Sequence, residues 1–248
     1  MEFQGKTIWV TGAARGIGHQ VAMDFQAQGA KVLGLDRSFD ASERPFETHE
    51  LDLARPDAVA SFCAQRLGGG ACLDVLVHAA GILRMGRSDE LSLSDWHACL
   101  DSNVSAAFYL LREVVPVFKR QRSGAIVVIA SNAAHVPRLG MAAYCASKAA
   151  LRSFSQCVAL ELAAYGVRCN VVSPGTTVTP MLHDMGLDEE DIRRTVLGLP
   201  DQYKLGIPLG KPATTQDIAA AVLFLASSRS GHVTMHDLVV DGGATLGA

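Results

Sequence analysis

Tyr144 and Lys148 lie four residues apart in a segment with the apolar periodicity of a long helix. Side chains at this spacing project from one face of a helix, so the phenol and the ammonium are expected to be neighbours. A tyrosine with an ordinary pKa of about 10 is a poor base at neutral pH, but an adjacent ammonium favours the phenolate and lowers that pKa. Ser131 ends the preceding apolar segment, thirteen residues before the tyrosine. Together these side chains predict an acid–base centre.

A glycine-rich segment near the N-terminus has the spacing Gly-x3-Gly-x-Gly, with Gly12, Arg15, Gly16, Ile17 and Gly18 at its key positions. It falls between an apolar strand and a helix, where a pyrophosphate can rest on the N–H groups that begin the helix. Glycines allow the backbone to approach such a ligand closely. The spacing also fits a tight turn without a ligand, so the dinucleotide interpretation needs support from elsewhere in the chain.

Asp36 provides that support, because it ends the next strand, eighteen residues after Gly18. A carboxylate there can accept both ribose hydroxyls of an adenosine. It would repel a 2′-phosphate, since two like unit charges at about 4 Å and an effective dielectric of about 20 repel by about 4 kcal/mol. Arg15 and Arg37 argue in the other direction, because either guanidinium could meet a phosphate. On balance the carboxylate predicts NAD rather than NADP.

Strand and helix patterns alternate along the whole chain. We expect strands at 6–11, 31–35, 49–53, 73–79, 125–130, 167–173 and 237–240, and helices at 16–28, 56–67, 94–121, 143–165 and 214–227. Ser94 is expected to cap the third helix, and Pro116 to kink it. Near-continuous apolar strands between amphipathic helices indicate a parallel sheet covered on both faces. Right-handed crossovers then make it a doubly wound α/β sheet of the Rossmann type.

The 248 residues suit a single domain spanning 1–248. Only the stretch 176–212 lacks clear strand signals. It holds glycines, prolines and mixed charge, and its segment Leu187–Leu197 is a candidate short helix. A long insertion after a strand of this fold is a candidate lid over the site.

Composition excludes several classes of function. The net charge of −3 gives no electrostatic reason to bind nucleic acid or an anionic membrane. The longest apolar runs, such as Ala219–Ala226, are far shorter than the ~20 residues that span a bilayer. The first residues lack a signal-peptide pattern, and the six cysteines form no CxxC pair, so we expect reduced thiols in a cytoplasmic protein. No metal-ligand spacing is present, and we expect no metal.

These motifs make the chain resemble the short-chain dehydrogenase/reductase family over essentially its full length. The matching residues are Thr11–Gly18, Asp36, Asp52-Leu53, Ala80-Gly81, Asn103, Ser131, Tyr144, Lys148, Pro174-Gly175 and Asp241-Gly242-Gly243. The resemblance implies a seven-stranded parallel sheet in the order 3-2-1-4-5-6-7 and a homotetramer. One position departs from the family: His78 stands where an asparagine is usual, and we expect it to be a core histidine.

The resemblance also implies roles for individual residues. Tyr144 would be the general acid/base, Lys148 would hold the nicotinamide ribose and lower the tyrosine pKa, Ser131 would bind the reacting oxygen, and Asn103 would support a water relay. NAD would contact Gly12, Arg15, Gly16, Ile17, Gly18, Asp36, Asp52, Leu53, Ala80, Gly81, Tyr144, Lys148, Pro174, Gly175 and Thr179.

A narrower resemblance points to one branch of the family, the 2,3-dihydro-2,3-dihydroxybenzoate dehydrogenases of catecholate siderophore biosynthesis. It is carried by residues 79–86, 203–211 and 236–248. It implies oxidation of an anionic cyclic dihydrodiol to a catechol acid. A planar carboxylate suits a guanidinium, and Arg84 and Arg138 are the two candidates to bind it.

Two other interpretations stay open. The chain could be another member of the family, acting on a cyclic alcohol or a 3-oxoacyl substrate. It could instead be an NAD-binding regulator without catalysis, although the presence of Ser131, Tyr144, Lys148 and Asn103 argues against this.

Overall fold

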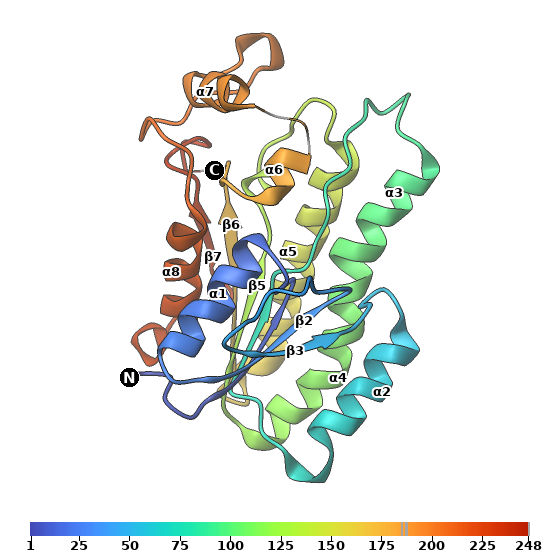
Figure 1. Cartoon of the computed structure of the whole chain (residues 1–248), viewed down its shortest axis with the longest axis vertical. Helices are drawn as coiled ribbons and strands as arrows, with labels where there is room; N and C mark the ends of the chain where they lie inside the picture. Colours follow the sequence, from blue (N-terminus) through green and yellow to red (C-terminus); the bar gives the residue numbers. More distant parts are fainter. Residues whose placement is uncertain (185, 187, 248) are drawn as a thin grey trace.

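The computed structural model describes residues 1–184, 186 and 188–247, and seven strands of this part form one parallel sheet (Figure 1). The spatial order is β3-β2-β1-β4-β5-β6-β7, which confirms the predicted fold class. The strands are β1 (Thr7–Thr11), β2 (Lys31–Asp36), β3 (Glu47–Glu50), β4 (Val75–His78), β5 (Ala125–Ile129), β6 (Arg168–Pro174) and β7 (Asp237–Val240).

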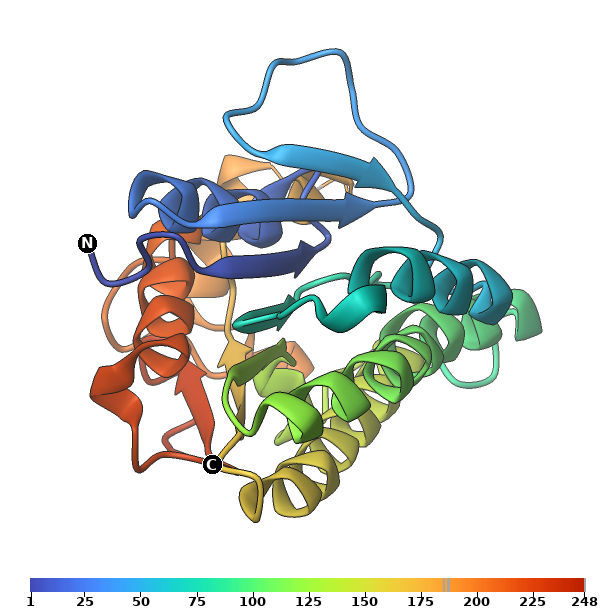
Figure 2. The ribbon, with the colours of Figure 1, turned by 90° about the horizontal axis from the view of Figure 1, so that it is seen from below.

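Helices cover both faces of the sheet, and each face has its own apolar core (Figure 2). Successive side chains of a strand point to opposite faces. In β5, Ile126 and Val128 therefore pack in one core, and Val127 and Ile129 in the other. The first core is covered by α2 (Pro56–Leu67), α4 (Ala106–Gln121) and α5 (Ala142–Ala163), and the second by α1 (Gly16–Ala27) and α8 (Thr215–Ala226).

Two local predictions are wrong. The third strand ends at Glu50, before the apolar residues that suggested it, because Leu51 and Leu53 turn inward to pack against the first core. The helix predicted with Ser94 as its cap begins two residues earlier, as α3 (Leu93–Leu100), and its cap is Ser92. The Ser92 hydroxyl accepts a 3.0 Å hydrogen bond from the N–H of Asp95, three residues on, as an N-cap requires.

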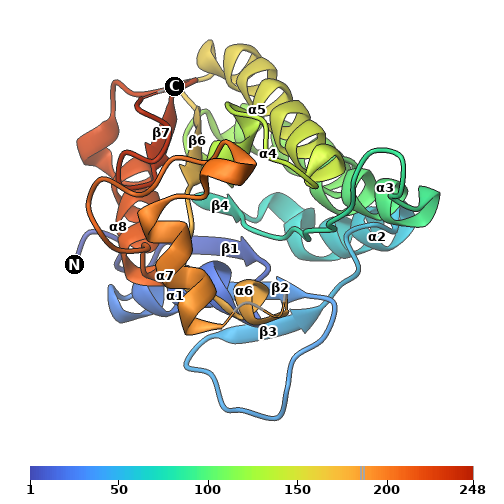
Figure 3. The ribbon, with the colours of Figure 1, turned by 90° about the horizontal axis from the view of Figure 1, so that it is seen from above.

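The predicted lid leaves β6 and returns before α8. It contains α6 (Pro180–Asp184), which we did not predict, and α7 (Glu189–Leu197). Both stand above the carboxyl ends of the strands, as the side view and the view from above agree (Figures 1 and 3). The predicted helix start at Leu187, the lid residue Met185 and the C-terminal Ala248 lie outside the described residues. The mobility of this segment and the single-domain organisation stay predictions.

The described part of the chain holds no helix that is both long enough and apolar enough to cross a bilayer. The six cysteines are free thiols, and Cys63, Cys99 and Cys169 are buried. Burial raises the pKa of the Cys63 and Cys169 thiols to about 12 in each case, so both are inert at neutral pH.

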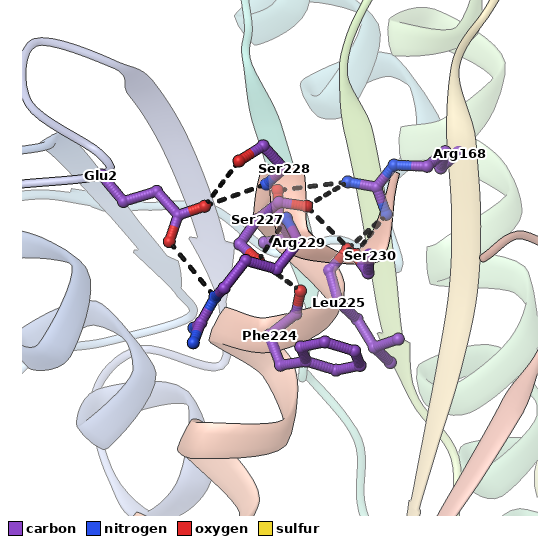
Figure 4. Close-up of polar contacts among 9 residues, drawn as sticks. Glu2, Arg168, Phe224, Leu225, Ser227, Ser228, Arg229 and Ser230 are labelled. Carbon is purple, nitrogen blue, oxygen red and sulfur yellow. Dashed lines mark hydrogen bonds and ion pairs between the residues drawn. The ribbon is translucent and has the colours of Figure 1, made fainter. Parts of the chain in front are cut away.

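The carboxyl end of α8 is held by Arg168, at the start of β6 (Figure 4). Its guanidinium donates to the carbonyl oxygens of Leu225, Ala226 and Ser227 at 2.6, 3.3 and 3.0 Å, and to the Ser230 hydroxyl at 2.8 Å. The last carbonyls of a helix lack intrahelical donors and carry partial negative charge, so a cation there satisfies both needs.

Replacing Arg168 with methionine should therefore destabilise the protein by about 1–3 kcal/mol, because buried carbonyls lose charged donors. For a chain of this size the melting temperature should fall by roughly 2–12 °C in a calorimetric scan. Arg229→Met is the matched control. Arg229 is 69% exposed and its nitrogen lies 3.6 Å from the Glu2 carboxylate, a geometry that contributes little. Equal losses in the two variants would rule out helix capping as the cause.

Candidate active site

Two adjoining cavities open at the carboxyl ends of the central strands. Their volumes are about 210 and about 380 Å³. The first lies over β1 and β2, and the second runs under the predicted lid. Both are lined by Ile17, Ala79, Gly81, Thr179 and Met181, so they form one continuous site. The site lies where strand order reverses, between β1 and β4, as expected for a doubly wound sheet.

The predicted cofactor residues are divided between these cavities. Those lining the first are Gly12, Arg15, Gly16, Ile17, Gly18, Asp36, Asp52, Leu53, Ala80, Gly81 and Thr179. Those lining the second include Tyr144, Lys148, Pro174 and Gly175.

The glycine loop is packed so closely that side chains are excluded. Gly12 has a φ of 68°, and a Cβ there would lie 2.9 Å from the Ala79 carbonyl carbon. A Cβ on Gly18 would overlap the carbonyl of Gly12. The loop thus brings bare backbone and the first N–H groups of α1 to the cavity wall. This cradle fits the pyrophosphate of a dinucleotide.

Asp36 is held rigidly beside this loop. Its two carboxylate oxygens accept hydrogen bonds from the N–H of Ala14 at 3.0 Å and from the N–H of Arg37 at 2.8 Å. Each oxygen keeps a second lone pair, and the side chain lines the first cavity. The carboxylate therefore fits a ribose with two free hydroxyls.

Tyr144 and Ser131 meet in the second cavity, at the start of α5 and the end of β5. Burial raises the pKa of Tyr144 to about 12, and its hydrogen bond with Ser131 opposes the increase. Loss of hydration around the buried phenolate therefore outweighs that hydrogen bond, and the lowering of this pKa by Lys148 stays a prediction.

Lys148 lies one helical turn after Tyr144 on α5. Its ammonium nitrogen lies 5.8 Å from the centroid of the Tyr144 ring and donates a 2.9 Å hydrogen bond to the carbonyl of Ile129. Burial lowers the pKa of Lys148 to about 8, so the side chain is largely charged at neutral pH. The i,i+4 spacing thus brings the two groups together as predicted.

Asn103 lies beneath the cavity floor, in a π-helical turn, Asp101–Ser105, that joins α3 to α4. The side-chain amide donates to the Ile82 carbonyl at 2.9 Å and to the Ser147 hydroxyl at 2.8 Å, and its oxygen accepts from the Ile82 N–H at 2.8 Å. A π-turn often marks a functional position. A Cβ on Gly81 would lie 2.9 Å from the Asn103 oxygen and 3.2 Å from the Lys148 nitrogen. Glycine therefore lets these two side chains approach, while the water relay stays a prediction.

His78 is fully buried at the end of β4. Thr11 Oγ1 accepts from the N–H groups of Ala79 and Ala80, so its own hydrogen is directed at His78 Nδ1, 3.1 Å away. The proton of the imidazole therefore sits on Nε2, which has no partner within the described ranges. Burial, and then the charge of Lys148, lower the pKa of His78 to about 3. His78 is a core histidine, as predicted, and it is neutral.

This neutrality makes folding sensitive to acid. Between the ordinary pKa of about 6.5 and the folded value of about 3, the unfolded chain binds a proton that the folded chain does not. Stability should thus fall by about 2 kcal/mol from pH 6.5 to 5 through this group. Urea unfolding over this range should show a smaller pH dependence in His78→Asn than in wild type. His232→Asn, at an exposed histidine, is the control, and an unchanged slope in His78→Asn would contradict the assignment.

Only one of the two arginines proposed for the substrate lines the cavity. Arg138 does so from the loop before α5. Arg84 lies outside both cavities, is exposed, and pairs with Asp95 at 3.1 Å, so we correct the expectation for it. The sequence analysis missed Lys204, which lines the same cavity from the lid. No sequence pattern identifies Lys204 as a site residue, because only the conformation of the loop brings it to the cavity.

Comparison with known proteins agrees with this geometry. Residues 12–245 match the family described as Enoyl-(Acyl carrier protein) reductase. The 2,3-dihydro-2,3-dihydroxybenzoate dehydrogenase of Escherichia coli (strain K12) is 51% identical over 248 residues and covers 100% of both chains. The protein of the same name from Bacillus subtilis (strain 168) is 42% identical over 254 residues, covering 98% of this chain and 97% of that one.

Solved structures add the same conclusion about the fold. The ligand-free aldohexose dehydrogenase of Thermoplasma acidophilum superposes with a TM-score of 0.89 at 30% identity, covering 99% of this chain and 96% of that one. The sheet order, the glycine loop and these full-length matches lead to one conclusion. The chain belongs to the short-chain dehydrogenase/reductase family of oxidoreductases, which bind a nicotinamide cofactor.

Proposed function

We propose that the chain oxidises 2,3-dihydro-2,3-dihydroxybenzoate to 2,3-dihydroxybenzoate with NAD, as a step of catecholate siderophore biosynthesis. One observation carries this proposal: the cavity that contains Tyr144, Ser131 and Lys148 also contains Arg138, which forms no ion pair with any described carboxylate. An alcohol-oxidising centre and a cation for an acid therefore share one cavity. The two relatives named above bear the name of this activity.

In the proposed reaction, the hydroxyl of Ser131 and the phenolate oxygen of Tyr144 hold one ring hydroxyl of the substrate. Tyr144, as phenolate, removes the hydroxyl proton, and the nearby ammonium of Lys148 stabilises the phenolate. A bound nicotinamide would supply the acceptor for the hydride that leaves the same ring carbon. The substrate thus loses one proton and one hydride and becomes a ketone. The ketone tautomerises to the aromatic catechol, which makes oxidation the favoured direction.

We propose that the cofactor is held by the glycine loop at its pyrophosphate, by Asp36 at the adenosine ribose and by Lys148 at the nicotinamide ribose. The complete proposed set is Gly12, Arg15, Gly16, Ile17, Gly18, Asp36, Asp52, Leu53, Ala80, Gly81, Tyr144, Lys148, Pro174, Gly175 and Thr179. We also propose a cytoplasmic homotetramer. Exposed apolar side chains on the outer helices support assembly, including Phe108 on α4 and Leu160 on α5.

The test is a spectrophotometric assay with purified enzyme, NAD and the dihydrodiol acid, following NADH and the catechol together. We expect equal amounts of both products. An analogue that lacks the carboxylate should be oxidised with a lower kcat/KM. Efficient turnover of a different cyclic alcohol or a 3-oxoacyl thioester, without turnover of the dihydrodiol acid, would contradict the proposed substrate. Binding of NAD without any turnover would favour the regulator.

A further inference from the structure

We infer that Lys204 and Arg138 form a two-cation site for the substrate carboxylate, so that the lid supplies part of the substrate specificity. This inference rests on the proposed function, because it assigns the carboxylate of that substrate to two named residues. It adds a group from the lid that the acid–base chemistry does not require.

The two cations reach one cavity from different parts of the chain. Arg138 comes from the loop between β5 and α5, and Lys204 comes from the segment that follows α7. The Arg138 loop is tied to the loop after β4, because the N–H of Gly86 donates to the Gly140 carbonyl at 2.8 Å. One wall of the site is thus part of the sheet scaffold, and the other is part of the lid.

The backbone of Lys204 is fixed by a tight turn. Its N–H donates to the carbonyl of Leu199 at 3.0 Å, and the N–H of Leu199 donates to the Lys204 carbonyl at 2.8 Å. The preceding Tyr203 has a φ of 53°, a left-handed conformation that costs energy for a residue with a side chain. Local backbone strain is therefore present at Tyr203, the residue that immediately precedes Lys204.

The two cations have little counter-charge within the cavity, although the Asp241 carboxylate, outside the cavity lining, attracts Arg138. Asp191 is the one carboxylate among the described residues that line this cavity. It is already engaged in the capping box of α7 and lies 3.8 Å from Arg194. Burial lowers the pKa of both Arg138 and Lys204, and the charge of Arg138 lowers that of Lys204 further. An anion bound between them would offset this repulsion and loss of hydration.

The remainder of the cavity indicates which anion fits. Apolar side chains line the same cavity, including Met85, Leu139 and Leu205. A small ring with a single carboxylate places its apolar body against these groups and its charge on the cations. A planar carboxylate can accept from the guanidinium and from the ammonium at the same time.

The experiment compares two probes that differ only in the carboxylate: 2,3-dihydroxybenzoate and catechol, titrated calorimetrically into the enzyme with NAD. Lys204→Met and Arg138→Met should each weaken binding of 2,3-dihydroxybenzoate by about 10- to 100-fold, as for loss of a charge-assisted hydrogen bond, and change catechol binding by less than about threefold. Lys204→Arg should retain most of the affinity. Arg194→Met, a lid cation at the same cavity that already has a partner, is the matched control and should have a small effect.

Three outcomes would overturn the site: unchanged affinity for 2,3-dihydroxybenzoate in Lys204→Met, an equal loss for catechol, or an equal loss in Arg194→Met. An equal loss for catechol would indicate that the substitution disturbs the structure of the cavity. An equal loss in Arg194→Met would indicate that the total positive charge of the cavity, and not a specific site, attracts the carboxylate. The turnover assay separates this inference from the proposed reaction. If wild type shows the expected pattern of binding but does not oxidise the dihydrodiol acid, the reaction fails and the anion site stands.

Discussion

Tyr144→Phe should lower kcat by about 100- to 10,000-fold, the range that a positioned acid–base group contributes. The change removes one hydroxyl and keeps the ring, which packs at the start of α5 and lies 5.8 Å from the Lys148 nitrogen. NAD binding, measured by calorimetry, should therefore change little. A loss in kcat with cofactor affinity retained is the signature of a group that acts in the transition state.

Tyr165→Phe is the matched control. Tyr165 follows the other end of α5, and its ring contacts Lys119 and Arg122 through its face, which phenylalanine preserves. That variant should keep wild-type kcat and melting temperature. Substantial turnover in Tyr144→Phe would mean that the proton is removed by another group, and the role of Ser131 would then need the same test.

The dependence on pH follows from the two shifted groups of this pair. Oxidation needs the phenolate, and with a pKa raised to about 12 its fraction grows tenfold for each pH unit below that value. Activity should thus rise with pH. Lys148, with a pKa lowered to about 8, loses its charge above that point and no longer stabilises the phenolate. The rise in log kcat should therefore become shallower above about pH 8, and a bell with its maximum below neutrality would contradict this scheme.

The architecture and the acid–base pair were predictable from local patterns. Apolar strands and helix signals specify a parallel sheet, and parallel strands bring their carboxyl ends to one edge. Ser131 and the glycine loop follow such ends directly, and Tyr144 begins the helix that follows the same strand as Ser131, so local patterns were enough to bring them together. The pairing of Asp36 with the glycine loop is a second case, because β1 and β2 are neighbours.

Other features depend on tertiary structure that no local pattern contains. Arg84 and Arg138 both follow strand ends, but a surface carboxylate, Asp95, pairs with one of them, and only the other lines the cavity. Lys204 reaches the site through a turn with left-handed backbone at Tyr203, where glycine would be the usual residue. The pKa of Tyr144 depends on how deeply the ring is buried. Charge spacing along a helix cannot reveal this depth.

Asp36 should make the enzyme prefer NAD over NADP by at least about tenfold in kcat/KM. Its carboxylate cannot rotate away from a 2′-phosphate without losing the hydrogen bonds from Ala14 and Arg37. Repulsion between like charges at about 4 Å amounts to about 4 kcal/mol at an effective dielectric of about 20, or roughly a thousandfold, before screening by salt reduces it. Kinetics with the two cofactors at low and moderate ionic strength measure the preference directly.

Asp36→Ser should reduce the preference for NAD over NADP through opposite effects on the two cofactors. The serine removes the acceptor of two ribose hydroxyls, so NAD loses affinity, and it removes the negative charge, so NADP gains. Arg37, the next residue, is exposed and would then be able to meet the phosphate. Glu50→Gln is the control, because Glu50 pairs with Asp36 in the register of β2 and β3 but lies outside the cavity. If Glu50→Gln shifts the preference for NAD over NADP as much as Asp36→Ser does, the preference comes from the total negative charge at this edge of the sheet and not from Asp36 itself. If wild type already prefers NADP, the arginines dominate and the electrostatic argument from Asp36 is wrong.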